Sequence, residues 1–179
     1  MALPGHMARD FVRPLSPRAL QPAGIDLSIC EVEELEGEGY LGEERRERPS
    51  GKALEASGNA WRLSPGAYRI RYCEAVWVPE NAVALIFPRS SLIRMGASLH
   101  GAVWDPGYHG RGEGLLLVHR TIALEKGVRV AQLVFFKLLA RAENLYSGVY
   151  QGENLGENAS RPGQAAPEER GVLRQEGGS

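Results

Sequence analysis

Residues 88 to 133 read PRSSLIRMGASLHGAVWDPGYHGRGEGLLLVHRTIALEKGVRVAQL, and in this stretch polar clusters alternate with short apolar runs. Similar runs, rich in β-branched and aromatic residues and separated by Gly and Pro, recur in the rest of the chain. This pattern is typical of strands joined by tight turns. The predicted strands cover residues 25–30, 68–78, 82–87, 115–118 and 128–138. The close spacing of the turn signals predicts an all-β fold of the sandwich or jelly-roll type.

Two of these strands differ in their apolar pattern. Residues 68–73 alternate with a period of two, as expected for a strand with one face in water. Residues 115–118 are continuously apolar, which predicts a strand buried on both faces.

One short helix is predicted between residues 90 and 95. Ser90 or Ser91 would cap its start, and Gly96 would end it. The free backbone N–H groups at the start of such a helix point toward an anion, so the two serines stand where a phosphate could bind.

Length and charge limit the classes of protein that fit. A chain of 179 residues with 43% hydrophobic content can form one compact core with frayed ends. With 21 basic and 22 acidic residues, the formal net charge of -1 gives no field that would attract nucleic acid or an anionic membrane. No apolar stretch approaches the roughly 20 residues of a transmembrane helix. We therefore expect a protein that neither binds nucleic acid nor associates with a membrane.

The cysteines and the N-terminus indicate where the protein works. Cys30 and Cys73 are far apart in sequence and outside any CxxC spacing, which argues against a disulfide framework and against a zinc site. Residues 1–13 lack the apolar core of a signal peptide. A reducing, cytoplasmic setting is the expectation.

Two segments lie outside the strand pattern. Residues 31–58 are densely charged, and we predict an exposed excursion between strands. Residues 153–179 have few large apolar groups and cannot bury enough surface to offset the entropy of ordering, which predicts a disordered tail. The predicted organisation is therefore a β domain over 1–152 and a flexible tail over 153–179.

The polar clusters of the opening stretch suggest nucleotide chemistry. Arg89 with the neighbouring hydroxyls of Ser90 and Ser91 can hold phosphate oxygens. Asp105, on an Asp-Pro-Gly turn, can act on water, and Gln132 can bond a further phosphate. Each residue also has an ordinary structural explanation: a capped surface helix, a hairpin turn, and a glutamine bonded to backbone.

Four motifs then occur in order and at strand-like spacing. They are QPAGIDL at 21–27, PRSSL at 88–92, GAVWDPGYHG at 101–110 and GVRVAQL at 127–133. Over residues 21–152 they resemble the trimeric dUTPase and dCTP deaminase superfamily, most closely dUTPases of the archaeal type. The resemblance implies a distorted jelly-roll β-barrel with one short helix, and a homotrimer whose sites are built from adjacent subunits.

The resemblance also implies a role for each candidate residue. Asp105 would activate the water that attacks the α-phosphate, and Tyr108 would pack on the deoxyribose and exclude a 2′-hydroxyl. The triphosphate would be bound by Arg89, Ser90, Ser91 and Gln132, and the uracil would be read by the hairpin of Gly101, Val103 and Trp104, with a possible contribution from His100. Asp26 would lie near the triphosphate and its Mg²⁺, although it could equally make a local turn at a strand end. Tyr150 and Gln151 belong to a Y-Q-G segment that reaches the triphosphate in the deaminase and archaeal branches.

Two departures from the deaminase pattern favour hydrolysis. Deaminases of the superfamily carry a Glu ten residues after the motif Asp and an Arg two residues before it, where this chain has Leu115 and Val103. Glu113 is the only nearby acid. The resemblance therefore predicts hydrolysis of dUTP to dUMP and pyrophosphate, assisted by Mg²⁺. The alternatives are a dCTP deaminase and a trimeric module that binds a nucleotide without turnover.

Overall fold

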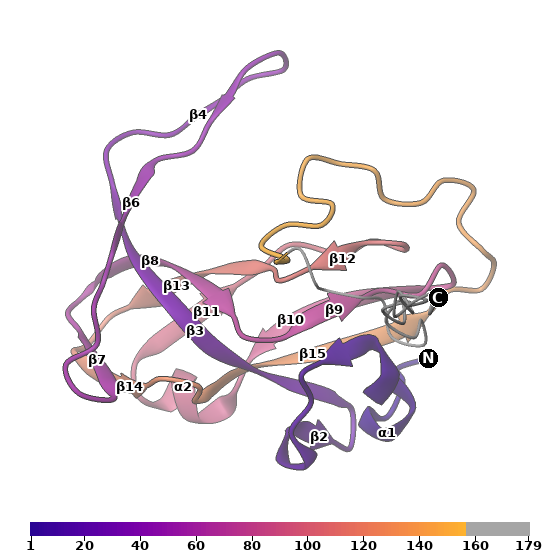
Figure 1. Cartoon of the computed structure of the whole chain (residues 1–179), viewed down its shortest axis with the longest axis horizontal. Helices are drawn as coiled ribbons and strands as arrows, with labels where there is room; N and C mark the ends of the chain where they lie inside the picture. The colour runs from indigo at the N-terminus through magenta and orange to yellow at the C-terminus, as the bar shows by residue number, and fades with distance from the viewer. Residues whose placement is uncertain (157–179) are drawn as a thin grey trace, which may run out of the picture.

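The computed structural model describes residues 1–156. The elements within these residues follow one another along the chain as shown in Figure 1. They are α1 (Gly5–Ala8), η1 (Arg9–Phe11), β1 (Val12–Arg13), η2 (Pro17–Ala19), β2 (Leu20–Gln21), β3 (Gly24–Glu36), β4 (Tyr40–Leu41), β5 (Arg46–Glu47), β6 (Ser50–Ala53), β7 (Ala60–Leu63), β8 (Gly66–Tyr72), β9 (Ala75–Trp77), β10 (Ala82–Pro88), α2 (Ser90–Arg94), β11 (Ala97–His100), β12 (His109–Gly110), β13 (Glu113–Val118), β14 (Ile122–Glu125) and β15 (Arg129–Lys137). The predicted all-β fold is confirmed, and residues 157–179 of the predicted tail lie outside the described residues.

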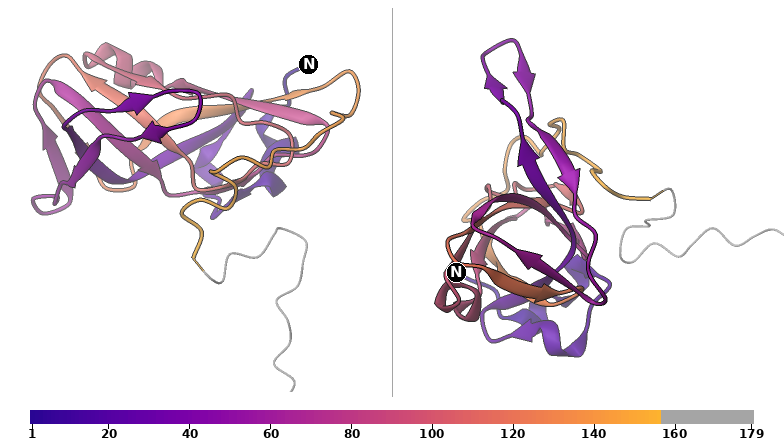
Figure 2. Two further views of the ribbon diagram at one scale, coloured as in Figure 1. Left: turned by 90° about the horizontal axis from the view of Figure 1, so that it is seen from above. Right: turned by 90° about the vertical axis from the view of Figure 1, so that its left-hand side faces the viewer.

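The main sheet curls into a barrel. Its strands follow the order β10-β15-β3-β8-β13-β11, and every neighbouring pair is antiparallel. After β11 the chain returns to β10, where the backbones of Trp104 and Ala84 exchange two hydrogen bonds of 2.9 Å. This contact joins the two ends of the sheet, and Figure 2 shows the resulting ring of strands in its right-hand view.

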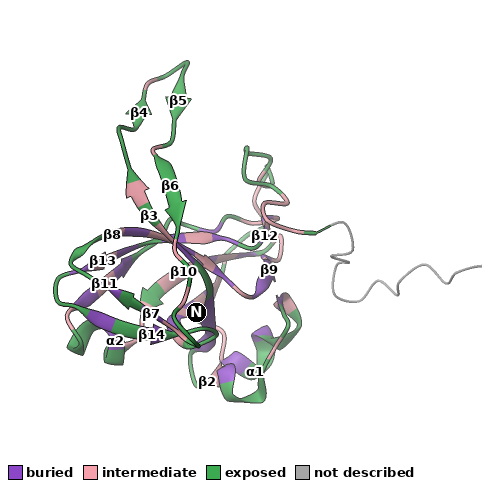
Figure 3. Cartoon of the chain, turned by 60° about the vertical axis from the view of Figure 1, so that its left-hand side comes forward, coloured by how far each residue is buried: buried purple, intermediate pink, exposed green. Residues whose placement is uncertain are grey.

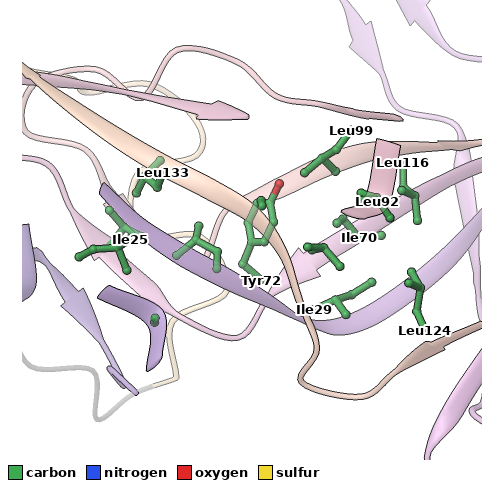
Figure 4. Packing of buried hydrophobic residues seen from close by; sticks show 14 of the residues in the cluster. Ile25, Ile29, Ile70, Tyr72, Leu92, Leu99, Leu116, Leu124 and Leu133 are labelled. Carbon is green, nitrogen blue, oxygen red and sulfur yellow. The ribbon is translucent and has the colours of Figure 1, made fainter. Parts of the chain in front are cut away.

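The core fills the inside of this ring. On β8 and β13 the inward positions alternate with outward ones, as a strand with one wet face requires. Figure 4 shows Ile29, Ile70 and Leu116 converging from three adjacent strands, and all three have no exposed surface. Completely burying an aliphatic side chain of this size contributes about 1.5–3 kcal/mol, so this layer holds the strands together.

Strand β13 was predicted to be buried on both faces, and this prediction is wrong. Leu116 and Val118 point into the core, whereas Leu115 is 38% exposed on the outer face. The outer face of β13 borders a cavity, so an apolar side chain there lines a hollow instead of a second packed layer. The continuous run of leucines could not reveal this difference.

The predicted strand 68–78 consists of two strands, because the chain leaves the sheet at Cys73 and Glu74. At this break Cys73 forms a disulfide with Cys30, with the two Cα atoms 4.9 Å apart. The expectation of no disulfide is therefore wrong. The register shift in β3 between Ile29 and Glu31 places Cys30 beside the end of β8, and sequence spacing carries no information about that register.

The charged segment 31–58 is exposed, as predicted, but much of it is regular. Strand β3 continues to Glu36 and pairs with β6, and β4 pairs with β5 beyond them. Figure 3 shows these strands projecting from the barrel as a narrow hairpin with mostly exposed residues. We call residues 33–53 the arm.

Helix α2 forms where it was predicted, and Gly96 ends it in a left-handed conformation with φ 84°. Its N-cap is Arg89 instead of a serine, because the Arg89 carbonyl accepts the first helical hydrogen bonds, from the N–H groups of Leu92 and Ile93. Ser90 and Ser91 are therefore exposed first-turn residues. None of the helices within residues 1–156 has the length and apolarity needed to cross a membrane.

Candidate active site

A cavity of about 540 Å³ lies on the outer face of β13, beside the loop that follows β11. Six of the predicted site residues line it: Gly101, Val103, Trp104, Asp105, Tyr108 and Tyr150. The floor includes Leu115, and the arm contributes Leu35, Arg48 and Pro49. The third motif and the Y-Q-G segment therefore meet at one cavity.

The hairpin of residues 100–105 is held against β10. A Cβ at Gly101 would collide with Cγ2 of Ile86, so only glycine permits this close approach. Gly112 has the same role on the other side, because a Cβ there would lie 2.6 Å from the Trp104 ring. Backbone N–H and C=O groups of the hairpin thereby border the cavity at fixed positions.

Asp105 opens a tight turn and also borders the cavity. The N–H of Tyr108 donates to the Asp105 carbonyl at 3.1 Å, and Gly107 adopts a left-handed φ of 84°. Asp105 is exposed, so its carboxylate is free to act on a water molecule. The turn and the predicted catalytic role are thus compatible at the same residue.

Tyr108 forms part of the cavity wall but is only 6% exposed. Its ring packs edge-on against Trp104 at 5.2 Å and Tyr146 at 5.6 Å, and its hydroxyl donates to Oε1 of Glu153 at 2.8 Å. Burial, reinforced by the negative charge of Glu153, raises the pKa of Tyr108. Burial also raises the pKa of Glu153, although the hydrogen bond from Tyr108 acts in the opposite direction.

Gln151 holds the loop that carries Asp105. Its Nε2 donates to the Gly107 carbonyl at 3.0 Å, and its Oε1 accepts from the His109 N–H at 3.1 Å. The neighbouring backbone adds a bond of 2.8 Å from the Gly152 N–H to the His109 carbonyl. In this structure both polar atoms of the Gln151 side chain bond the loop backbone, and Gln151 does not line the cavity.

Two of the predicted phosphate-binding residues, Arg89 and Gln132, belong to a second group around Asp26. This carboxylate is 1% exposed, and its Oδ2 lies 3.3 Å from Nε of Arg89 and 3.1 Å from Nη1 of Arg129. Gln21 adds a bond of 3.0 Å to the same oxygen. Burial raises the pKa of Asp26, while the two arginines act in the opposite direction. Gln132, directly opposite Asp26 in the sheet, donates to the Ala23 carbonyl at 2.9 Å.

The two groups do not meet within one chain. None of Asp26, Arg89, Ser90, Ser91 and Gln132 lines the cavity. The backbone of Trp104 is hydrogen-bonded to Ala84, and the five steps along the extended backbone from Ala84 to Arg89 span about 17 Å. Since Gly101 lies against Ile86, the hairpin runs antiparallel to β10, and Asp105 lies toward the strand end remote from Arg89.

The donor set does not fit a metal ion held by the protein alone. Within residues 1–156 no three His, Cys, Asp or Glu side chains gather as ligands. Asp26, the predicted metal residue, already has two guanidinium groups and an amide on one oxygen. A Mg²⁺ ion usually takes one or two carboxylates together with substrate phosphates, and Oδ2 of Asp26 is already engaged by protein donors.

Sequence reasoning missed several residues that shape the two groups. Arg129 lies within the fourth motif, so its charge beside Gln132 was a signal that could have been used. Arg48, Arg69 and Glu153 come from the arm, β8 and the start of the predicted tail. Only the tertiary fold brings these three residues to the cavity, and no local sequence pattern indicates it.

Comparisons with known proteins agree with this structure. A family model described as dCTP deaminase-like matches residues 6–138. A protein of Aeropyrum pernix, named probable deoxyuridine 5'-triphosphate nucleotidohydrolase, is 49% identical over 139 residues, which are 76% of this chain and 87% of the relative. A protein of Methanocaldococcus jannaschii, named deoxyuridine 5'-triphosphate nucleotidohydrolase, is 33% identical over 156 residues, covering 85% of this chain and 99% of the relative.

A solved structure supports the fold. The 2'-deoxycytidine 5'-triphosphate deaminase of Agrobacterium tumefaciens superposes with a TM-score of 0.57 at 20% identity, covering 75% of this chain and 47% of that chain. The identity is low, so this likeness concerns the fold alone. From the matching family model and the sequence relatives, the chain belongs to the dCTP deaminase-like family, together with proteins named deoxyuridine 5'-triphosphate nucleotidohydrolase.

Proposed function

We propose that this protein hydrolyses dUTP to dUMP and pyrophosphate. The observation that carries the proposal is the exposed Asp105 carboxylate at the edge of a cavity bordered by backbone hydrogen-bonding groups. The sequence relatives support it, because their names state a nucleotidohydrolase of deoxyuridine triphosphate. The base would lie against the hairpin, and the α-phosphate would lie near Asp105.

The proposed reaction needs no covalent intermediate. Asp105 accepts a proton from a water molecule as the water oxygen bonds the α-phosphorus. The bond from that phosphorus to the oxygen bridging to the β-phosphate breaks, and pyrophosphate leaves. Arg89 and the backbone N–H groups near Ser90 and Ser91 would neutralise the charge that develops on the phosphates. Asp26 and Arg129 would position Arg89 for this task.

We propose that Asp105 of one subunit and Arg89 of the next form a single site in a homotrimer. The support is the separation of the two groups, since Ala84, the partner of Trp104, lies about 17 Å along β10 from Arg89, and Arg89 does not line the cavity. A cyclic arrangement places the phosphate group of each copy beside the cavity of its neighbour and repeats the contact three times.

The expected Mg²⁺ would come with the substrate. Because Oδ2 of Asp26 is held by two arginines and no other carboxylate lies with it, no step of the proposed mechanism passes through a metal held by residues 1–156. An ion bound to the triphosphate oxygens would lower their charge before the site is filled. Asp26 would act through Arg89 and Arg129.

Deamination of dCTP is the second candidate, since the matching family model is described as dCTP deaminase-like. The position of the deaminase Glu holds Leu115, whose side chain lines the cavity. Glu113, an acid two residues away on the same strand, accepts a hydrogen bond of 3.3 Å from Arg71 and lies 3.7 Å from Arg48 and 3.8 Å from Arg69. The leucine cannot carry a proton and the oxygens of Glu113 are directed at protein donors, so these contacts favour hydrolysis.

A product assay separates these functions. The purified full chain is incubated with dUTP, dCTP, dTTP or UTP, with and without Mg²⁺, and pyrophosphate and ammonia are measured. We expect pyrophosphate from dUTP and no ammonia from dCTP. Asp105→Asn should reduce pyrophosphate release by about 10²–10⁴-fold, because a positioned base contributes this factor. Ammonia from dCTP would support the deaminase, and an unchanged rate in Asp105→Asn would contradict the proposed role.

A further inference from the structure

One end of the cavity is formed by the arm and the adjoining strands instead of the family motifs. Arg48 comes from the arm, and Arg69 comes from β8. A second hollow of about 570 Å³ adjoins this end and shares both arginines with the first. This end of the cavity therefore presents guanidinium groups that the proposed reaction does not use.

The sheet register fixes one of these arginines beside the cavity floor. Leu115 lies directly opposite His100 on β11 and directly opposite Arg69 on β8. Directly opposed residues share a face of the sheet, so the three side chains form a row on the outer face. Arg69 thus flanks the apolar floor on which a base would lie.

Of the acids that line this end of the cavity, Glu153 accepts from Tyr108 and Glu113 lies among arginines. Glu113 accepts from Nη2 of Arg71 and from Nδ2 of Asn154, both at 3.3 Å. Its other oxygen lies 3.7 Å from Nη1 of Arg48 and 3.8 Å from Nε of Arg69. The acceptor capacity of this carboxylate is therefore directed at protein donors instead of at the cavity.

Arg48 is held only loosely at the rim. Its side chain is 61% exposed, and its guanidinium lies over the Tyr150 ring at 5.9 Å. Its contact with Glu113, at 3.7 Å, is longer than a hydrogen bond. The N–H groups of Arg48 can therefore turn toward a molecule in the cavity, whereas Arg69 is anchored by hydrogen bonds to Glu33.

We propose that Arg48, supported by Arg69, selects pyrimidines whose position 4 carries a carbonyl oxygen over those that carry an amino group. A guanidinium has only donors, so it bonds a 4-carbonyl and leaves a 4-amino group unpaired. A base with a 4-amino group lacks the hydrogen bond that a 4-carbonyl accepts from the guanidinium, so it binds more weakly. The inference rests on the proposed function, since it assumes a pyrimidine nucleotide in this cavity.

Binding of monophosphates tests the inference without requiring turnover. The dissociation constants of dUMP and dCMP are measured by calorimetry for the full-length wild type, Arg48→Gln and Arg48→Lys. The glutamine amide offers both a donor and an acceptor, so the preference for dUMP should fall about tenfold. Lysine keeps a donor-only group, and Arg48→Lys should retain the preference.

Arg45→Gln is the matched control. Arg45 lies on the same arm, bonds Glu47 at 2.7 Å and does not line the cavity, so the same loss of charge there should leave the preference unchanged. Equal affinity of the wild type for the two nucleotides, or an unchanged preference in Arg48→Gln, would overturn the inference. Failure of the wild type to release pyrophosphate from dUTP would instead count against the proposed function, while the binding ratio still decides the role of Arg48.

Discussion

Three carboxylates within residues 1–156 have a raised pKa, and each has a different kind of partner. Asp26 faces two arginines, Glu153 accepts from the Tyr108 hydroxyl, and Glu74 accepts from the N–H and the hydroxyl of Ser28. Burial is the leading cause of a raised pKa in all three. Asp26 is in direct contact with two positive charges, which oppose the effect of burial on its pKa. The hydrogen-bond partners of Glu74 are the neutral groups of Ser28, so Glu74 offers the clearest test of how burial changes the pKa of a carboxylate here.

Glu74→Gln should make the free energy of unfolding less dependent on pH. Glu74 has a folded-state pKa above its ordinary value of 4.5, so it stabilises the fold below pH 4.5 and loses that contribution as pH rises through the raised pKa. Glutamine imitates the protonated acid, because it can accept from the Ser28 N–H and donate to the hydroxyl. Urea unfolding of both proteins at several pH values from 4.5 upward measures the difference. As pH rises, the free energy of unfolding of the variant should increase relative to that of the wild type. A difference that stays constant with pH would show that folding does not shift the pKa of Glu74.

The seam between β3 and β8 is where sequence reasoning and structure differ most. Both strands were predicted from their apolar residues, and α2 was predicted from Ser90 and Gly96, because these signals are local. The disulfide was missed because pairing depends on register across the seam, and register follows from the whole sheet. The outward position of Leu115 was missed for the same reason, since a run of leucines does not indicate which face borders a cavity.

Reduction of the Cys30–Cys73 disulfide should destabilise the barrel. The two cysteines are separated by 43 residues, and loop-closure entropy assigns about 4 kcal/mol to a cross-link of this length. Guanidinium unfolding with and without a reductant, after thiol counting confirms each state, measures the effect. A double variant, Cys30→Ser with Cys73→Ser, should unfold identically in both conditions. Equal stability of the oxidised and reduced wild type would contradict a stabilising cross-link.

On the scale of the whole molecule, the candidate site is divided between two places on one barrel. The sequence motifs predicted most of its members, including Asp105 and Arg89, because each lies in a short polar cluster. Their separation along β10 could not be predicted, since it depends on how the loop after β11 returns to that strand. The contacts of Gln151 with the Asp105 loop could not be predicted either, because they form only in the folded chain.

Mixing two inactive variants tests the central claim most directly. Asp105→Asn and Arg89→Gln each remove one half of the proposed site and should each show little pyrophosphate release from dUTP, while size-exclusion chromatography confirms that both assemble. After equal amounts are unfolded and refolded together, three quarters of randomly assembled trimers are mixed and each has one intact site, so about a quarter of the wild-type rate should return. A mixture no more active than its parents would contradict a site shared between subunits.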